Sequence, residues 1–438
     1  MYENKKILVL GAGKSGISVA KILASKNDVT LSDVNKLDEK VTNDLENLGI
    51  KIIITDNQLD LIDKTYDLIV KNPAIKYTSN LVKKINELEI NLENEMEVAY
   101  HYLPKDITII GVTGSNGKTT TTTIIYEILK ASDKPVVLGG NIGYALCEVL
   151  PKVKSGDILL LEISDHQLCD FKDFKTNISV LTNISKTHLD YHGTYEHYKN
   201  MKGKIFNNHT SNDLAIINKA NIDALDVSKN INSKKEYFND SINYIKDGKI
   251  YLDNKVVLDT LDKKIKGNHN YENILAALLV VKEFNVNINI IKEVLKSFNG
   301  VEHRLEYVAT INGVEYYNDS KSTNPESTIT ALKTFTKPLH LILGGENRNQ
   351  DFSVLNPYLK FVKHIYAVGE VTDYVYNYAM DLNISCDKCY TLKSAMEKIK
   401  ENVLSGDVVL LSPGSSSQDQ YPHFEDRGIE FKKYLEKL

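Results

Sequence analysis

Short apolar runs alternate along the chain with longer amphipathic segments, a pattern typical of parallel α/β folds. The runs are bounded by polar or glycine residues, as expected for strands that are buried on both faces of a sheet. The predicted strands are KKILVL, DVTLSDVN, KIIIT, DLIVK, DITIIGVTG, DILLLEI, ISVLTNI, LAIIN, VEYYND, LHLILGG, HIYAVG and DVVLLSP. Helices are predicted for ISVAKILASK, TTTTTIIYEILKA, ILAALLVVKEF and SAMEKIKENVL. We therefore predict an α/β fold of several doubly wound sheets.

The order of these elements predicts three consecutive α/β domains. A chain of 438 residues is too long for one ordinary core. We place a Rossmann-like domain at 1–98, a central P-loop ATPase-like domain at 99–299 and a second Rossmann-like domain at 300–438.

Composition and charge narrow the class of protein. Hydrophobic residues make up 42% and charged residues 25%, and the net charge is -5. Such a chain is expected to be soluble, with no general attraction to nucleic acid or to anionic membranes. The N-terminus lacks a signal-peptide pattern, and no apolar stretch approaches the ~20 residues of a membrane span. We expect a cytoplasmic protein, and in a reducing cytosol the pair Cys386 and Cys389 predicts neither a metal nor a redox site.

The segment GVTGSNGKTTTTT at 111–123 predicts a phosphate-binding loop, because a strand precedes it and a helix follows. Free backbone N–H groups at a helix N-terminus attract phosphate, and glycine lets the backbone approach closely. The lysine can reach the β and γ phosphates, and a threonine can offer its hydroxyl to Mg²⁺. The predicted ATP-binding residues of the loop are Gly114, Ser115, Asn116, Gly117, Lys118, Thr119 and Thr120.

Two polar residues follow neighbouring strands of the predicted central sheet. Glu162 ends DILLLEI, and His188 follows ISVLTNI. In a doubly wound sheet both fall at the carboxyl edge beside the phosphate loop, where ligands bind. A carboxylate and an imidazole there can hold Mg²⁺ or Mn²⁺.

The N-terminal GAGKSG follows a strand and opens a helix, and Asp33 ends the next strand. This is the pattern of a dinucleotide-binding turn. Taken alone, it favours a nicotinamide-dependent oxidoreductase, which is the first alternative function.

Together these segments resemble the Mur ligases, ATP-dependent amide-forming enzymes of peptidoglycan synthesis. The shared motifs occur in family order through all three predicted domains. They are TGSNGKTTT, GGNIG, LEIS, THLDYHGT, YKNMK, GNHNYEN, VEHRLE and NDSKSTNPEST. The segments DSKSTN and LLSPGSSSQDQYPHFEDRG are most similar to the branch that adds D-glutamate to UDP-N-acetylmuramoyl-L-alanine.

The resemblance implies roles for individual residues. Lys118 and Thr119 would hold ATP phosphates and metal, Glu162 and His188 would bind magnesium, and Lys202 would ligate metal as a carbamate. It also implies that the glycine turn binds UDP rather than NAD, and we expect a monomer. Further ATP contacts are implied for Asn270, Arg304 and Asp319. Substrate contacts are implied for Ser15, Asp33, Asn141, Lys321, Thr323, Arg348, Ser417 and Phe424.

Three positions depart from the family's usual sequence. Asp165 and His166 stand where the family commonly has Ser-Phe, and Gln418 replaces an apolar residue. Gln418 could bond the acceptor substrate or face water. The change at Asp165 and His166 motivates a second alternative, a regulatory paralogue without catalytic activity.

Overall fold

The computed structural model describes residues 2–259, 265 and 267–437. Contacts divide the chain into two compact units. The first comprises Met1–Thr260 with Glu272–Val294, and the second comprises Leu261–Tyr271 with Leu295–Leu438. Within the described part of the chain, no helix is both long and apolar enough to span a membrane.

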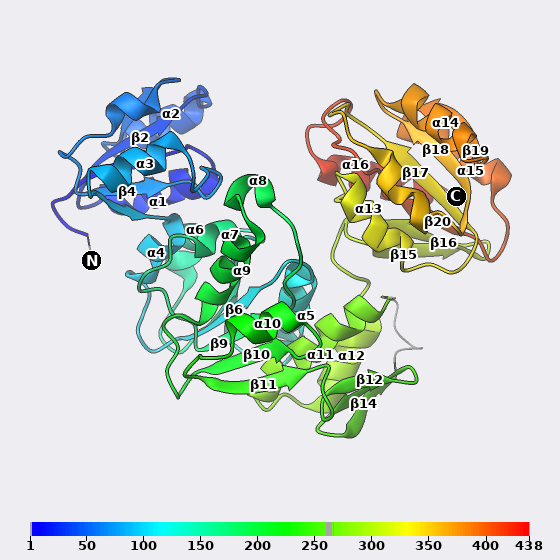
Figure 1. The fold of residues 1–438 in the computed structure, drawn as a ribbon, viewed down its shortest axis with the longest axis horizontal. Coiled ribbons are helices and arrows are strands. Elements are labelled where there is room, and N and C mark those ends of the chain that lie inside the picture. The colour runs from blue at the N-terminus through cyan, green and yellow to red at the C-terminus, as the bar shows by residue number, and fades with distance from the viewer. Residues whose placement is uncertain (1, 260–264, 266, 438) are drawn as a thin grey trace. The chain divides into compact units, whose positions relative to one another are not determined.

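The first unit begins with a parallel sheet of strand order β3-β2-β1-β4-β5 (Figure 1, blue). Its strands are β1 (Lys6–Leu10), β2 (Asp28–Asp33), β3 (Lys51–Ile54), β4 (Leu68–Lys71) and β5 (Asn91–Glu93). The helices around it are α1 (Lys14–Ala24), α2 (Glu39–Glu46) and α3 (Asn80–Glu87). Strand order reverses between β1 and β4, so the turn after β1 lies where such sheets bind ligands.

A second, larger parallel sheet of the same unit has the order β11-β10-β9-β6-β8-β7. Its strands are β6 (Thr108–Thr113), β7 (Val136–Gly140), β8 (Ile158–Glu162), β9 (Ile178–Leu181), β10 (Leu214–Asn218) and β11 (Lys234–Phe238). The helices of this region are α4 (Glu95–Tyr100), α5 (Lys118–Ala131), α6 (Leu146–Val149), α7 (Asp165–Leu168), α8 (Leu189–His192), α9 (Tyr195–Gly203), α10 (Ile222–Val227), α11 (Asn268–Lys282) and α12 (Ile288–Ser297). An antiparallel sheet joins β12 (Tyr244–Lys246), β13 (Lys249–Leu252) and β14 (Lys255–Asp259).

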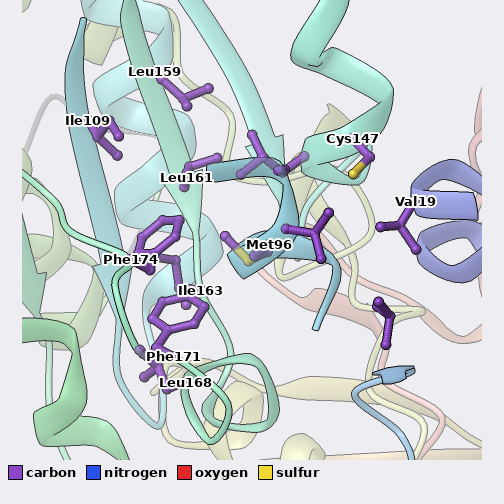
Figure 2. Close-up of a cluster of buried hydrophobic side chains, with 14 of the residues drawn as sticks. Val19, Met96, Ile109, Cys147, Leu159, Leu161, Ile163, Leu168, Phe171 and Phe174 are labelled. Atoms are coloured by element: carbon purple, nitrogen blue, oxygen red, sulfur yellow. The ribbon is translucent and has the colours of Figure 1, made fainter. Parts of the chain in front are cut away.

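One buried apolar cluster joins the two parallel sheets of the first unit. It contains Val19 of α1, Met96 of α4, Cys147 of α6 and Leu161 of β8, which Figure 2 shows in one group. Each of these side chains is nearly or fully buried. The N-terminal sheet is therefore packed onto the central sheet through α1, α4 and α6.

A buried ion pair adds a polar link between the same two sheets. Lys71 Nζ at the end of β4 lies 2.8 Å from the Asp170 carboxylate after α7, and both side chains are almost inaccessible to solvent. Nearby, the Tyr191 hydroxyl donates to the Pro73 carbonyl at 3.0 Å. These contacts hold the carboxyl end of β4 beside α7 and α8.

The second unit contains a sheet of order β15-β16-β20-β17-β18-β19, in which the β15–β16 pair is antiparallel and the remaining pairs are parallel. Its strands are β15 (Glu306–Ile311), β16 (Val314–Asn318), β17 (Leu339–Gly344), β18 (Val362–Val368), β19 (Ser385–Tyr390) and β20 (Val408–Leu411). Its helices are α13 (Pro325–Leu332), α14 (Thr372–Asp381), α15 (Leu392–Asn402) and α16 (Phe424–Leu435). Buried clusters lie on both faces of this sheet.

The structure confirms the predicted α/β class, and the predicted apolar runs form strands of the two parallel sheets and of the mixed sheet in the second unit. Sequence patterns missed β12 to β14 and the edge strands β5, β7, β11, β15 and β19. The sequence of β19, SCDKCY, is too polar for the buried-strand pattern. Cys386 and Cys389 are therefore strand residues, and both are free thiols. The boundaries after residues 98 and 299 stay predictions.

Replacing Lys71 with methionine should destabilise the first unit by about 3–5 kcal/mol, because the Asp170 carboxylate would remain buried without its partner. The double variant Lys71→Met/Asp170→Leu should recover most of this loss. Urea denaturation of each variant measures the change. Lys337→Met, which breaks the exposed pair with Glu315, is the control and should cost no more than about 1 kcal/mol. An equal loss in Lys71→Met and Lys337→Met would contradict a structural role for the buried pair.

Candidate active site

The carboxyl ends of four strands meet at one edge of the central sheet. Strand β6 lies between β8 and β9, with Val112 opposite Glu162 and Thr113 opposite Leu181. Strand β7 adds Gly140 opposite Glu162. All these pairings are parallel, so the loop after β6 and the residues after β7, β8 and β9 leave the sheet on the same side. The structure thus brings together the phosphate loop, Glu162 and Asn141 at one sheet edge, where sequence analysis expected Glu162.

Two glycines let the loop after β6 close onto its neighbours. Gly114 has φ 149°, and Gly117 has φ 83° as the residue that precedes α5. A Cβ atom on Gly114 would lie 1.9 Å from Thr182 Oγ1, and one on Gly117 would lie 2.2 Å from Asn273 Oδ1. The loop therefore has no room for side chains at these positions, and its backbone takes a shape that favours glycine.

Hydrogen bonds fasten the loop to the end of β9. The Ser115 N–H donates to the Asn183 carbonyl at 2.8 Å, and the Asn116 N–H donates to Asn183 Oδ1 at 3.0 Å. Lys118 Nζ donates to the carbonyls of Gly114 (2.8 Å) and Ser115 (3.0 Å), so its ammonium lies over the loop. Thr119 and Thr120 are buried in the first turn of α5. This arrangement is that of an anion-binding loop with a lysine beside it.

Glu162 carries a buried carboxylate that is only half satisfied. The residue is 2% exposed, and its Oε1 accepts a hydrogen bond from Asn141 Nδ2 at 2.7 Å. Its Oε2 is buried and has no hydrogen-bond partner among the residues that the structure describes. An unpartnered buried carboxylate oxygen is costly unless a cation or donor satisfies it. Glu162 therefore fits the predicted metal site, with Asn141 holding its orientation.

Lys202 lies completely buried in α9, next to α7. Its Nζ is 3.2 Å from Asp165 Oδ1 and donates to Thr113 Oγ1 at 3.3 Å. Asp165 Oδ2 in turn accepts from His192 Nε2 at 2.8 Å. Burial lowers the pKa of Lys202, and Asp165 opposes this shift. Burial alone would raise the pKa of Asp165, but His192 and Lys202 hold it well below its usual range.

Two further imidazoles lie beside this group. His188 is exposed and precedes α8 with φ 52°, and its ring lies 5.3 Å from the ring of His166. Burial lowers the pKa of His166 to about 4, so this ring is neutral near pH 7. Ligand atoms of Asp165, His166 and His192 all lie within 4.8 Å of one another. A carboxylate and two imidazoles in this arrangement fit a divalent metal ion.

In the second unit, five predicted residues lie on loops after strands, namely Asp319, Lys321, Thr323, Arg348 and Ser417. Asp319, after β16, is 3% exposed and accepts hydrogen bonds from Ser322 Oγ (2.6 Å) and Ser412 Oγ (2.7 Å). Burial raises its pKa to about 6. Lys321 is exposed, with Nζ 5.8 Å from the centre of the Phe424 ring. Asp319 thus braces this loop, and its predicted contact with ATP ribose stays a prediction.

Arg348 lies on the exposed loop after β17. Its Nε donates to Glu346 Oε2 at 2.8 Å, and its Nη2 donates to Gln418 Oε1 at 2.7 Å. Gln418 therefore bonds to Arg348 in this structure. Ser417 beside it is buried, and Thr323 is exposed.

Comparisons with known proteins agree with this geometry. Residues 112–281 match the Mur ligase middle domain, and residues 303–414 match the Mur ligase glutamate ligase domain. The UDP-N-acetylmuramoylalanine–D-glutamate ligase of Geobacillus sp. (strain WCH70) is 41% identical, over 100% of this chain and 98% of that protein. The ligase of the same name from Bacillus mycoides (strain KBAB4) is 38% identical over the same shares. The chain belongs to the Mur ligase family.

Solved structures share the fold of this Mur ligase. The UDP-N-acetylmuramate–alanine ligase MurC of Thermotoga maritima has a TM-score of 0.59 at 18% identity, covering 99% of this chain and 100% of that one. The MurF ligase of Thermotoga maritima, solved in complex with ADP, has a TM-score of 0.57 at 19% identity, over 99% and 96%. At these sequence identities, the structural similarity shows a shared fold and nothing more.

The turn after β1 of this Mur ligase is closed by Asp33. Its Oδ2 accepts from the Ala12 N–H at 2.6 Å, and its Oδ1 accepts from the Asn35 N–H at 2.9 Å. Ser15 lies partly buried in the first turn of α1. Besides Asp319, two further predicted ATP contacts are in the second unit: Asn270, which is buried near the start of α11, and Arg304, which is partly buried. Their roles stay predictions.

Sequence analysis missed Arg427, which organises the loops of the second unit. The residue is 3% exposed, and its guanidinium donates to the carbonyls of Ser320 (2.9 Å) and Ser415 (3.1 Å) and to Ser320 Oγ (3.0 Å). Burial lowers its pKa to about 10. Arg427 lies in FEDRG, part of a segment that is similar to the family, and this similarity could have drawn attention to it. The sequence alone does not show whether an arginine is buried or exposed.

Changing Lys118 to alanine should lower ATP-dependent phosphate release by about 10²–10³-fold, because a preorganised cation beside the phosphates is lost. Phosphate release under saturating substrates measures the effect, and circular dichroism checks the fold. Lys130→Ala removes an exposed lysine from the last turn of the same helix and should be near wild type. A folded Lys118→Ala enzyme with normal turnover would exclude this role.

Proposed function

We infer that this Mur ligase joins D-glutamate to UDP-N-acetylmuramoyl-L-alanine at the expense of ATP, in peptidoglycan precursor synthesis. The observation that carries this function is the full-length similarity to ligases of that name, at 41% and 38% identity. The phosphate loop with Lys118 supports the use of ATP. We further propose that the enzyme works as a monomer in the cytoplasm, where ATP is available.

The chemistry requires an activated acid, because a carboxylate is a poor acyl donor. The carboxylate oxygen of the substrate's terminal L-alanine attacks the γ-phosphorus of ATP, and ADP leaves. The amine of D-glutamate then attacks the acyl phosphate carbon, loses a proton and expels inorganic phosphate. The loop N–H groups and Lys118 orient the triphosphate and neutralise charge on the phosphoryl oxygens during the first step.

Thr119, Glu162 and His188 are the proposed ligands of Mg²⁺, with Mn²⁺ as a substitute, and Lys202 belongs to the same site. The unpartnered Glu162 Oε2 and the cluster around Asp165 support this assignment. When bound, the metal would supply positive charge that offsets charge on the phosphates. Asn141 fixes the Glu162 carboxylate and is also the proposed contact to the muramoyl substrate.

The turn after β1 is the proposed site for the UDP part of the substrate. Ser15 lies on this turn, and Asp33 braces it through the Ala12 N–H. A nicotinamide enzyme would use the same turn, but membership of the Mur ligase family favours a nucleotide sugar. On the second unit, Asn270, Arg304 and Asp319 are proposed to contact ATP.

The acceptor D-glutamate carries two carboxylates, and only its amine reacts, so both acids must be held. Arg348, Lys321 and Thr323 lie on loops at the carboxyl edge of the second sheet and can bind them, with Ser417 and Phe424 beside them. The guanidinium of Arg348 can hold a carboxylate through two parallel hydrogen bonds. Gln418 and Glu346 already fix its orientation.

One assay separates this function from its alternatives. The enzyme is incubated with ATP, Mg²⁺, UDP-N-acetylmuramoyl-L-alanine and D-glutamate, and both phosphate and ligated product are measured. Equal amounts of phosphate and product, each dependent on D-glutamate, support the ligase. Turnover of NADH with no product would favour the oxidoreductase, and the lack of both signals would favour a regulatory paralogue.

Arg348→Ala should raise the KM for D-glutamate at least about tenfold, since a charge-assisted pair of hydrogen bonds is lost. The KM for ATP should change little. The KM for D-glutamate of Arg348→Lys should lie between those of the wild type and Arg348→Ala, because lysine cannot form the bidentate contact. Lys360→Ala, an exposed charge before β18 at the opposite edge of the sheet, serves as the control. Parallel increases in both KM values would indicate a general defect instead of a lost acceptor contact.

A further inference from the structure

The backbone of Asn116 in the phosphate loop is held by the two residues that follow β9. Its N–H donates to Asn183 Oδ1 at 3.0 Å. Its carbonyl accepts from Asn183 Nδ2 at 3.1 Å and from Thr182 Oγ1 at 2.5 Å. The carboxamide of Asn183 thus uses its acceptor and one of its donors on the same loop residue. Asn116 is therefore fixed both in position and in the direction of its carbonyl.

This contact also fixes the direction of the Gly117 N–H. The bond between Asn116 and Gly117 is a trans peptide, in which the C=O and N–H groups lie in one plane and point in opposite directions. Because the Asn116 carbonyl points toward the end of β9, the Gly117 N–H points away from it. The N–H groups of Ser115 and Asn116 are already bonded to Asn183. Gly117 therefore has the next N–H along the loop that can face an anion.

Glycine at position 117 makes this contact important. Gly117 has φ 83° and precedes α5, whose N-terminus attracts phosphate. Glycine allows wide backbone rotation, so a peptide next to it could turn over if its carbonyl were not held. A turned peptide would direct the Asn116 carbonyl, with its partial negative charge, toward the phosphate. The loop would then repel the anion that it is proposed to bind.

We propose that Asn183, supported by Thr182, is a positioning residue for the ATP phosphates, because it holds the peptide at 116–117 with its N–H toward the nucleotide. The inference rests on the proposed use of ATP. Asn183 acts through the loop and needs no contact with the nucleotide. Its loss should therefore weaken binding of the phosphate groups without a comparable change in the rest of the sheet.

The chain offers a matched control at the opposite end of β9. Asn177 Oδ1 accepts from the Ile109 N–H of β6 at 2.8 Å, so it also fastens a neighbouring segment through a carboxamide. Asn177 precedes β9, whereas Asn183 lies beyond its carboxyl end. Replacing either asparagine with alanine removes a side-chain contact to the backbone, but Asn183 contacts the phosphate loop and Asn177 lies at the other end of the strand.

The first test observes the Gly117 N–H directly. The sequence has three Asn–Gly pairs, at 116–117, 299–300 and 312–313. Labelling with ¹³C-carbonyl asparagine and ¹⁵N-glycine therefore leaves three amide signals in a ¹³C-filtered NMR spectrum, and Asn116→Gln assigns the Gly117 signal by removing it. On adding ADP and Mg²⁺, the Gly117 proton should move downfield in wild type, and should move less in Asn183→Ala at saturating ADP. Gly313, in the turn between β15 and β16, is the internal control and should not move.

The second test measures ADP binding by isothermal titration calorimetry. Asn183→Ala should bind ADP at least about tenfold more weakly, the loss expected when a hydrogen bond to a charged group fails. Asn177→Ala should bind ADP as wild type does, although thermal unfolding should show a similar loss of stability in both variants. Thr182→Val removes the second donor to the Asn116 carbonyl and should weaken ADP binding, whereas Thr182→Ser keeps the hydroxyl and should not.

A Gly117 amide that does not respond to ADP in wild type, or that responds equally in Asn183→Ala, would overturn the proposal. So would equal ADP affinities of wild type and Asn183→Ala, or an equal loss of affinity in Asn177→Ala. If Asn183→Ala fails to fold, equal ADP affinities of Thr182→Val and Thr182→Ser would overturn it instead. Neither readout uses turnover, so an enzyme that binds ADP in this way but forms no ligated product would refute the proposed function and leave this inference standing.

Discussion

The site depends on the parallel register of β6 with β8 and β9. Because these strands run in the same direction, the phosphate loop, Glu162 and the segment carrying His188 all leave the sheet at one edge. The loop can lie flat on the end of β9 only where Gly114 lacks a Cβ, since Thr182 occupies that space. A rigid sheet edge and two positions without side chains thus hold the loop and Lys118 at the same edge as buried carboxylates.

Buried charge at this edge is distributed unevenly. Asp165 is neutralised by Lys202 and accepts a hydrogen bond from His192, whereas one oxygen of Glu162 has no hydrogen-bond partner within the described part of the chain. An unpartnered carboxylate destabilises the protein alone but becomes favourable when a cation binds. The chain therefore maintains one satisfied anion that fixes geometry and one incomplete anion that gains most from a metal. This division explains how two carboxylates close in sequence can serve different purposes.

Sequence patterns predicted most strands inside the sheets because buried strands are continuous apolar runs. The edge strands β5, β7, β11 and β15 were missed. Glu162 could be assigned because a strand end fixes its position. The contact between Asp165 and Lys202 could not be predicted from the sequence, because it depends on which face of α9 packs against α7. Strands β12 to β14 and β19 are partly exposed, so their sequences lack the apolar signal. Arg427 could not be assigned for the same reason: its motif can be read from the sequence, but the burial of its side chain depends on tertiary packing.

In the second unit, two arginines illustrate how a binding group is prepared. Arg427 is buried and holds the carbonyls of Ser320 and Ser415, so the loops after β16 and β20 keep a fixed backbone. Arg348 is exposed, but Gln418, on the loop that Arg427 organises, accepts from its guanidinium. A polar residue at 418 thus replaces apolar packing with directional control of the arginine. A guanidinium that is already oriented loses less entropy when it binds a carboxylate, so the hydrogen bond from Arg348 to Gln418 would favour the proposed acceptor contact through preorganisation.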